Sequence, residues 1–105
     1  MSPVLPDDDL IRQFPDIREI REIVGIYEIP VKDVEVPLKI KIIRIQDKYV
    51  GIASLGVRAK GQKEYYRDIR PYPSRDAALA GSIAGFFRDL QPGASIREIK
   101  NWNIL

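Results

Sequence analysis

The sequence predicts an α+β domain, an antiparallel meander sheet of three to four strands packed by an N-terminal helix and a C-terminal helix. Apolar residues recur at steps of three and four near the start of the chain and again in its last third, which is helical spacing. Between these stretches, residues 38–70 read as short strands separated by turn-forming residues. With 105 residues, 45% of them hydrophobic, the chain has the size and composition of one domain with one core.

Residues 1–9 are expected to form a mobile tail, because two prolines and an acidic run precede the first apolar repeat. The remaining residues, 10–105, form the single domain. An N-terminal helix is predicted from Leu10 to Val24, with Pro15 in the first turn of the helix proper and Gly25 at its end. The connection from Ile26 to Val36 has strand character and supplies the candidate fourth strand.

Three strands are predicted at Leu38–Gln46, Tyr49–Arg58 and Glu64–Arg70, joined by two-residue turns at Asp47–Lys48 and Lys60–Gly61. Directly opposed residues of antiparallel strands share a face, so counting from the turns assigns the two faces. One face holds most of the core. The other carries the rows Lys39–Gly56–Tyr65, Lys41–Ser54–Arg67 and Ile43–Ile52–Ile69, and its small central residues leave room for a base or phosphate.

After the sheet, Ser74 is expected to cap a helix that runs to Leu90. Its predicted apolar stripe consists of Ala77, Ala80, Ile83, Ala84, Phe87 and Leu90. Gly81 and Gly85 predict close packing of this helix on the sheet, with contact across a dimer as the alternative. Ser95 to Trp102 predicts a short last helix, and a terminal strand is the rival interpretation.

Charge is distributed unevenly along the chain. Residues 32–75 hold eleven Lys/Arg and five Asp/Glu, a net of +6, whereas residues 1–31 have a net of −4. A basic sheet bearing tyrosines is typical of a surface that binds a nucleic-acid backbone with accessible bases. The predicted stacking residues are Tyr65 and Tyr72, and the predicted phosphate contacts are Lys39, Lys41, Arg58, Lys60, Lys63, Arg67 and Arg70. A solvated basic face is the alternative.

The amino-acid composition limits the catalytic and metal-binding functions that the chain could have. With no Cys and no His, the chain lacks a thiolate metal site, a cysteine nucleophile and the usual general base. The glycines do not form a phosphate-binding loop. We therefore expect a protein that is not an enzyme and has no metal or cofactor. Without a long apolar run or a signal peptide, a cytoplasmic location and no membrane partner are expected. Sixteen Ile and no Thr resemble the usage of a hyperthermophile.

The stretch from Lys48 to Arg67, a basic sheet segment that ends in Tyr65 and Tyr66, resembles the ThermoDBP type of archaeal single-stranded DNA-binding protein. The resemblance covers most of the chain without a diagnostic motif. It implies a small α+β domain in which single strands lie in a cleft with a hydrophobic and basic lining. It also implies a C-terminal leucine zipper that pairs two protomers. This chain ends at Leu105 without heptads, so either it is a trimmed domain or the resemblance is wrong.

The function expected from these observations is non-catalytic binding of single-stranded DNA or RNA on the basic, aromatic sheet surface. The alternative is a protein–protein interaction module or regulatory homodimer. It would use an isoleucine patch of Ile43, Ile45, Val50, Ile52 and Ile69, or the Gly81/Gly85 helix face. A third interpretation, a reader of duplex DNA that inserts the sheet into the major groove, is disfavoured by a net charge of only +2.

Overall fold

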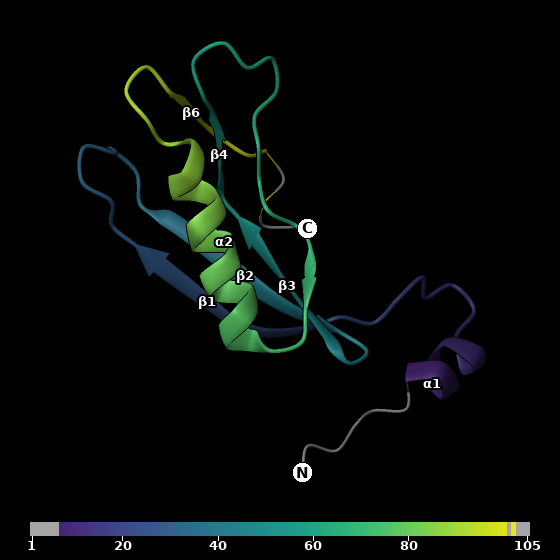
Figure 1. Cartoon of the computed structure of the whole chain (residues 1–105). Coiled ribbons are helices and arrows are strands. Elements are labelled where there is room, and N and C mark those ends of the chain that lie inside the picture. Colours follow the sequence, from purple (N-terminus) through teal and green to yellow (C-terminus); the bar gives the residue numbers. More distant parts are fainter. Residues whose placement is uncertain (1–6, 101, 103–105) are drawn as a thin grey trace.

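The chain adopts the predicted α+β class in a computed structural model, which describes residues 7–100 and residue 102. Four strands form one antiparallel sheet in the order β1-β2-β3-β5, and β4 pairs with β6 in a second sheet (Figure 1). The elements are α1 (Asp7–Gln13), β1 (Glu22–Ile29), β2 (Leu38–Ile45), β3 (Lys48–Ala53), β4 (Leu55–Arg58), β5 (Pro71–Tyr72), α2 (Arg75–Asp89) and β6 (Ser95–Glu98). No helix in this part of the chain is long and apolar enough to cross a membrane.

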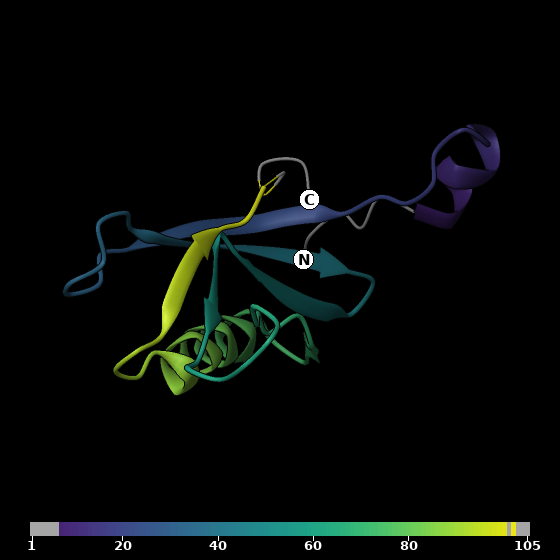
Figure 2. The ribbon, with the colours of Figure 1, turned by 90° about the horizontal axis from the view of Figure 1, so that it is seen from above.

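The N-terminal helix is shorter than predicted and lies elsewhere. It begins at Asp7, inside the expected tail, and ends at Gln13, because Pro15 disfavours helical geometry at the residue before it. The residues from Glu22 onward, predicted to finish that helix, instead form β1, which pairs along its length with β2. Figures 1 and 2 show α1 beyond the end of the sheet, so it does not cover the sheet as expected.

The β2–β3 hairpin has the predicted faces but a different register. Ile45 pairs with Lys48, so the turn is Gln46–Asp47, and Gln46 takes a positive φ of 57°. Moving the turn by one residue shifts every cross-strand pair by two positions, which leaves each side chain on its face. Ile40 therefore opposes Ala53, where Leu55 was predicted, and both remain in the core.

The predicted second strand is divided at Ser54 into β3 and β4, which belong to different sheets. The predicted third strand, Glu64–Arg70, is not formed as such. Only Tyr66 bridges to Val57, and the two residues of β5 pair with Tyr49 and Val50 at the far end of β3. The predicted turn at Lys60–Gly61 is present, closed by a hydrogen bond from the Gln62 amide to the Ala59 carbonyl, but it lies within a longer loop between β4 and Tyr65.

The core lies between α2 and the face of the sheets that we call the inner face (Figure 2). Ser74 caps α2 as predicted, with its Oγ accepting a hydrogen bond from the Ala77 amide at 3.1 Å. The predicted apolar stripe is wrong in part. The most buried positions are Ala78, Ser82, Gly85, Phe86 and Asp89, whereas the predicted Phe87 is 43% exposed.

Small residues allow one side of α2 to pack closely against the sheet and the segment before β5. A Cβ added at Gly51 would overlap the Ser82 hydroxyl, so β3 and α2 approach each other closely there. Gly81 lies under the Tyr72 ring, and a Cβ at Gly85 would be 3.1 Å from the Asp68 Cβ. The predicted close packing of these two glycines is therefore confirmed, and the segment 66–72 already covers them.

The C-terminal segment forms a strand, which was the rival interpretation, in place of the predicted short helix. In β6, Ile96 pairs with Val57 and Arg97 with Gly56. The segment then crosses to the face opposite α2, where the Trp102 indole N–H donates to the Ile52 carbonyl at 2.8 Å. Of the predicted isoleucine patch, Ile43 and Ile52 are 3% and 8% exposed, and only Ile69 remains open at 61%.

Candidate nucleic-acid interface

Tyr65 lies on the face of β4 and β6 that points away from α2, here called the outer face. Val57, Ile96 and Tyr66 are cross-strand partners on the inner side, so the alternate residues Gly56, Arg58 and Arg97 point outward. The Tyr65 ring is flanked by two of them, with the Arg58 guanidinium 5.0 Å and the Arg97 guanidinium 4.4 Å from its centroid. The structure thus brings an aromatic ring and two cations together on an open strand pair.

Gly56 makes this arrangement possible, although not in the way the sequence predicted. A Cβ at Gly56 would lie 3.1 Å from Tyr65 Cβ and 3.1 Å from Ile99 Cδ1. The protein's own side chains therefore fill the room above Gly56 that was expected for a base. Any base that stacks here contacts the Tyr65–Arg97 layer above the strand, not the backbone.

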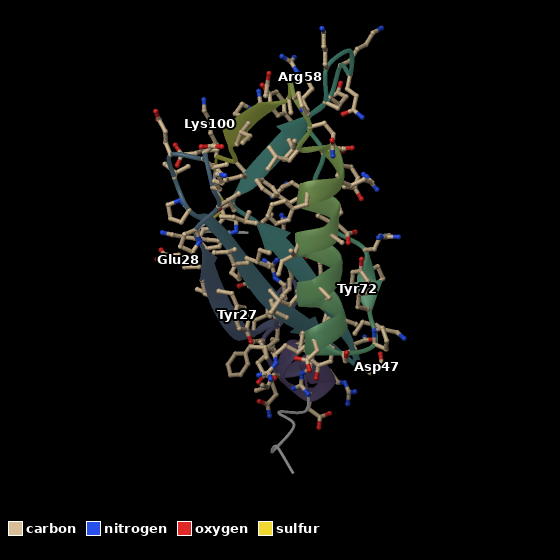
Figure 3. All side chains as sticks on the ribbon, turned by 60° about the vertical axis from the view of Figure 1, so that its left-hand side comes forward. Tyr27, Glu28, Asp47, Arg58, Tyr72 and Lys100 are labelled. Carbon is tan, nitrogen blue, oxygen red and sulfur yellow. The ribbon has the colours of Figure 1, made fainter. Side chains whose placement is uncertain are left out.

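Two further cations extend the surface from Arg58. Lys60 and Lys63 are exposed in the loop that leads from β4 to Tyr65. The Ala59 amide donates to the Gln62 Oε1 and the Gln62 amide donates to the Ala59 carbonyl, each at 3.0 Å, which fixes the turn. These lysines stand at the opposite end of the molecule from the β2–β3 turn, as the positions of Arg58 and Asp47 show (Figure 3).

Lys41 and Arg67 were predicted to contact phosphates, but the fold uses both internally. Lys41 is 3% exposed, donates from Nζ to the Trp102 carbonyl at 2.7 Å and lies 5.0 Å from the Trp102 ring centroid. Burial, and then the nearby charge of Arg21, lowers the pKa of Lys41. Arg67 donates to the Ala53 carbonyl at 3.3 Å, and burial lowers the pKa of its guanidinium.

Arg70 and Tyr72 belong to a different cluster, centred on the buried Asp68. The Asp68 carboxylate accepts hydrogen bonds from the Arg70 side chain and from the Tyr72 hydroxyl. Burial alone would raise the pKa of Asp68, but these hydrogen bonds and the Arg70 charge outweigh it and hold the pKa below its ordinary value. The same hydrogen bond, followed by burial, raises the pKa of Tyr72. This cluster packs against Gly81 of α2, on the inner side.

Of the predicted cations, Lys39 and Arg58 remain half-buried on the outer face, and Lys60 and Lys63 are exposed in the loop that follows β4. Sequence reasoning missed Arg97, because Ser95–Trp102 was predicted to be helical. The spacing of Ile96 and Ile99 is itself helical, so local periodicity held no signal for a strand with Arg97 outward. Within residues 7–100 and 102, no group of three or more acidic residues is placed to hold a metal ion.

Comparisons with known proteins give no independent assignment. No family model, no curated protein and no solved structure matches the chain. The resemblance to the ThermoDBP type stays a prediction, and the case for a function depends on the outer face itself.

Proposed function

We propose that the chain is a non-catalytic protein that binds single-stranded DNA or RNA on its outer face. The observation that carries the proposal is the Tyr65 ring with the Arg58 and Arg97 guanidiniums 5.0 Å and 4.4 Å from its centroid, on the outer face of β4 and β6. Aromatic rings and guanidinium planes stack on unpaired bases of any sequence, and cations beside them bind the backbone. A cytoplasmic location, where such strands are accessible, belongs to the same proposal.

The two arginines are suited to phosphate contacts because their positions are already set. Each guanidinium lies over the Tyr65 ring, so less side-chain freedom is lost when a phosphate binds. The planar fork of donors can bind two phosphate oxygens at once. Lys60 and Lys63, on the adjoining loop, add point charges along the path of the backbone.

A single strand fits this surface better than a duplex does. Stacking on the Tyr65–Arg97 layer requires the flat face of a base, which a duplex hides within its own stack. The outer face is also a short strand pair flanked by a loop, and the net charge of the chain is only +2. High affinity for a duplex would require more phosphate contacts than this surface offers.

A homodimer is the second candidate, and exposed apolar residues on β1 favour it. Ile23 and Ile26 are 59% and 57% exposed on an edge strand, and Phe14 is 54% exposed nearby in the sequence. Edge strands of this kind can pair with another chain. Light scattering distinguishes the candidates, because a stable dimer without affinity for oligonucleotides supports only the interaction module.

Fluorescence anisotropy tests the main proposal with a labelled oligothymidylate of about 12 nucleotides, a size within the range of known single-strand sites. We expect binding that weakens with salt, with a duplex of equal length bound much less tightly. Tyr65→Ala should weaken single-strand binding about tenfold, since stacking contributes about 1–3 kcal/mol per base.

The matched control is Phe87→Ala, which removes an exposed aromatic ring from α2 and should leave the affinity unchanged. Circular dichroism confirms that both variants are folded. An unchanged affinity in Tyr65→Ala would contradict the stacking role, and no binding to either oligonucleotide at low salt would overturn the proposal.

A further inference from the structure

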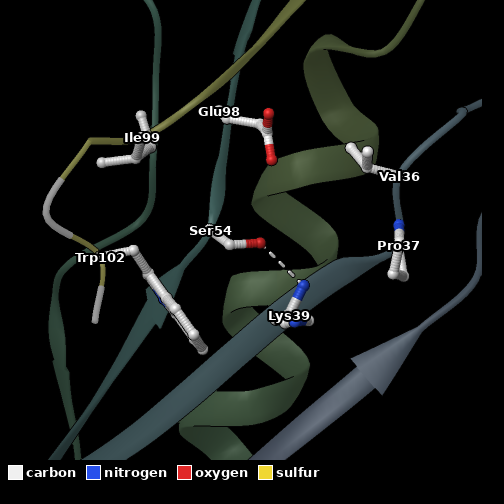
Figure 4. A pocket seen from close by; sticks show the side chains of 7 residues that line it. All are labelled: Val36, Pro37, Lys39, Ser54, Glu98, Ile99 and Trp102. Atoms are coloured by element: carbon white, nitrogen blue, oxygen red, sulfur yellow. Dashed lines mark hydrogen bonds between the residues drawn. The ribbon is translucent and has the colours of Figure 1, made fainter.

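A hollow of about 310 Å³ lies at the edge of β6, between the start of β2 and the segment that follows β6 (Figure 4). This volume is within the range of small-molecule pockets. One wall is apolar, from Val36 and Pro37, and the Trp102 indole stands on the opposite side. Lys39, Ser54 and Glu98 provide the polar groups.

The hollow is continuous with the surface around Tyr65. Ile99 lines it, and Ile99 Cδ1 and Tyr65 Cβ each lie 3.1 Å from the position that a Cβ on Gly56 would take. Ser54 fixes the junction, because its carbonyl accepts from the Ile99 amide at 2.8 Å and its hydroxyl accepts from the Lys39 amide at 2.9 Å. Ile99 therefore borders both the hollow and the residue that carries the Tyr65 ring.

The charges in the hollow are arranged for a ligand that carries both donors and acceptors. Lys39 and Glu98 line the same space, yet neither forms an ion pair with any residue in the described part of the chain. Figure 4 shows the Glu98 carboxylate extending into the space between Val36 and Ser54. A carboxylate only accepts hydrogen bonds and an ammonium only donates them.

Guanine is the base whose edge matches this pair most fully. It presents an acceptor, O6, beside two donors, N1–H and the N2 amino group, and both donors can reach one carboxylate. Adenine and cytosine offer a carboxylate one exocyclic amino group, and thymine offers one ring N–H between two carbonyls. Bases of single strands are commonly bound through these exposed edges.

We propose that this hollow binds a guanine base of the single strand. Glu98 accepts from N1–H and the N2 amino group, Lys39 donates to O6, and the base lies between the Trp102 indole and the Val36–Pro37 wall. The inference depends on the proposed function and adds a base preference to it.

The test compares oligothymidylates that carry one central guanosine, inosine or adenosine with the plain strand, using fluorescence anisotropy. Since a strand can slide along the surface, a single guanine can reach the hollow. We expect guanosine to raise affinity about tenfold, as a good bidentate pair does. Inosine, which lacks the N2 amino group, should have a smaller effect, and adenosine little.

Glu98→Gln should abolish the guanine preference, measured within this variant as the ratio of the affinities for the guanosine-bearing strand and for plain oligothymidylate. Glu35→Gln is the matched control, because Glu35 lines the adjacent hollow with Glu98 but not this one, and it should retain the preference. Binding of all strands without a guanine preference, or a preference that survives in Glu98→Gln, would overturn this inference alone. No binding to any strand would overturn the proposed function as well.

Discussion

The salt dependence of binding can be calculated from the cations that the fold leaves on the outer face. Five are available, with Lys39, Arg58 and Arg97 on that face and Lys60 and Lys63 on the adjoining loop. With about 0.7 counterions released per phosphate contact on a single strand, five contacts give a slope of log K against log salt of about −3.5. Affinity for oligothymidylate should therefore fall about 130-fold between 50 and 200 mM salt.

A pair of double variants separates the outer face from the overall charge. Lys60→Ala with Arg97→Ala removes two of the five contacts, so the slope should fall to about −2.1 and the loss over the same salt range to about 20-fold. Lys48→Ala with Arg75→Ala also removes one lysine and one arginine, both exposed. They lie at the starts of β3 and α2, at the end of the molecule away from β4 and β6 (Figure 1). This control should keep the slope of about −3.5.

Anisotropy titrations at four or more salt concentrations measure these slopes, and thermal unfolding confirms that each variant is folded. Equal slopes in the two double variants would refute the reasoning, because binding would then follow net charge and not a particular surface.

Two further predictions concern the fold that holds the site. Gly51→Ala should lower the free energy of unfolding by about 1–3 kcal/mol, because a Cβ there overlaps the Ser82 hydroxyl and lies 3.1 Å from Ser82 Cβ. Urea unfolding measures this loss of stability. Adding Ser82→Gly to the Gly51→Ala variant should recover part of the lost free energy. An unaltered urea midpoint in Gly51→Ala would contradict the close packing. Asp68→Asn should lower the same quantity by about 2 kcal/mol at neutral pH, since it weakens hydrogen bonds to a buried carboxylate. Because the folded pKa of Asp68 lies below its ordinary 3.8, this stabilisation is present above that value and is lost as pH falls through the folded pKa. Thermal unfolding across this range should show a smaller acid sensitivity in Asp68→Asn, and equal sensitivity would exclude Asp68 as its source.

Local signals predicted much of the fold correctly. The alternation in β2 placed Ile40 and Ile42 in the core, and both are fully buried. The Ser74 cap was also predictable, because capping depends on residues within one turn. The register of the β2–β3 hairpin was not, since Gln46 adopts a left-handed conformation that its residue type does not favour. A shift of two residues nevertheless preserves the faces, so the outer positions of Lys39 and Gly56 were assigned correctly.

The spacing of apolar residues along the sequence could not predict which distant segments pair as strands. The isoleucines between Ile17 and Ile23 recur at helical steps, yet β1 is stabilised by pairing with β2, which local periodicity does not register. Arg97 shows the same limit, because it faces outward only once β6 pairs with β4, and its partner Gly56 is far away in the sequence.

Charge counts along the sequence also overstate the charge that a ligand meets. The net of +6 in residues 32–75 includes Lys41, which holds the Trp102 carbonyl, and Arg70, which is bound to Asp68. A count of free cations therefore requires the hydrogen bonds of each side chain. The site keeps fewer contacts than the sequence suggested, but gains Arg97 beside Tyr65.

Ser54 connects the two parts of the proposed binding surface, the hollow and the surface around Tyr65. The chain leaves the large sheet at this residue and enters the small one, so β4 and β6 turn away from β2 and β3. Its hydroxyl and carbonyl accept from Lys39 and Ile99, which ties the start of β2 to the end of β6. The break in the strand thus creates the hollow and, through Ile99, sets it beside Tyr65. Stacking and base selection would then depend on the same bend, which a continuous strand from Tyr49 to Arg58 would not provide.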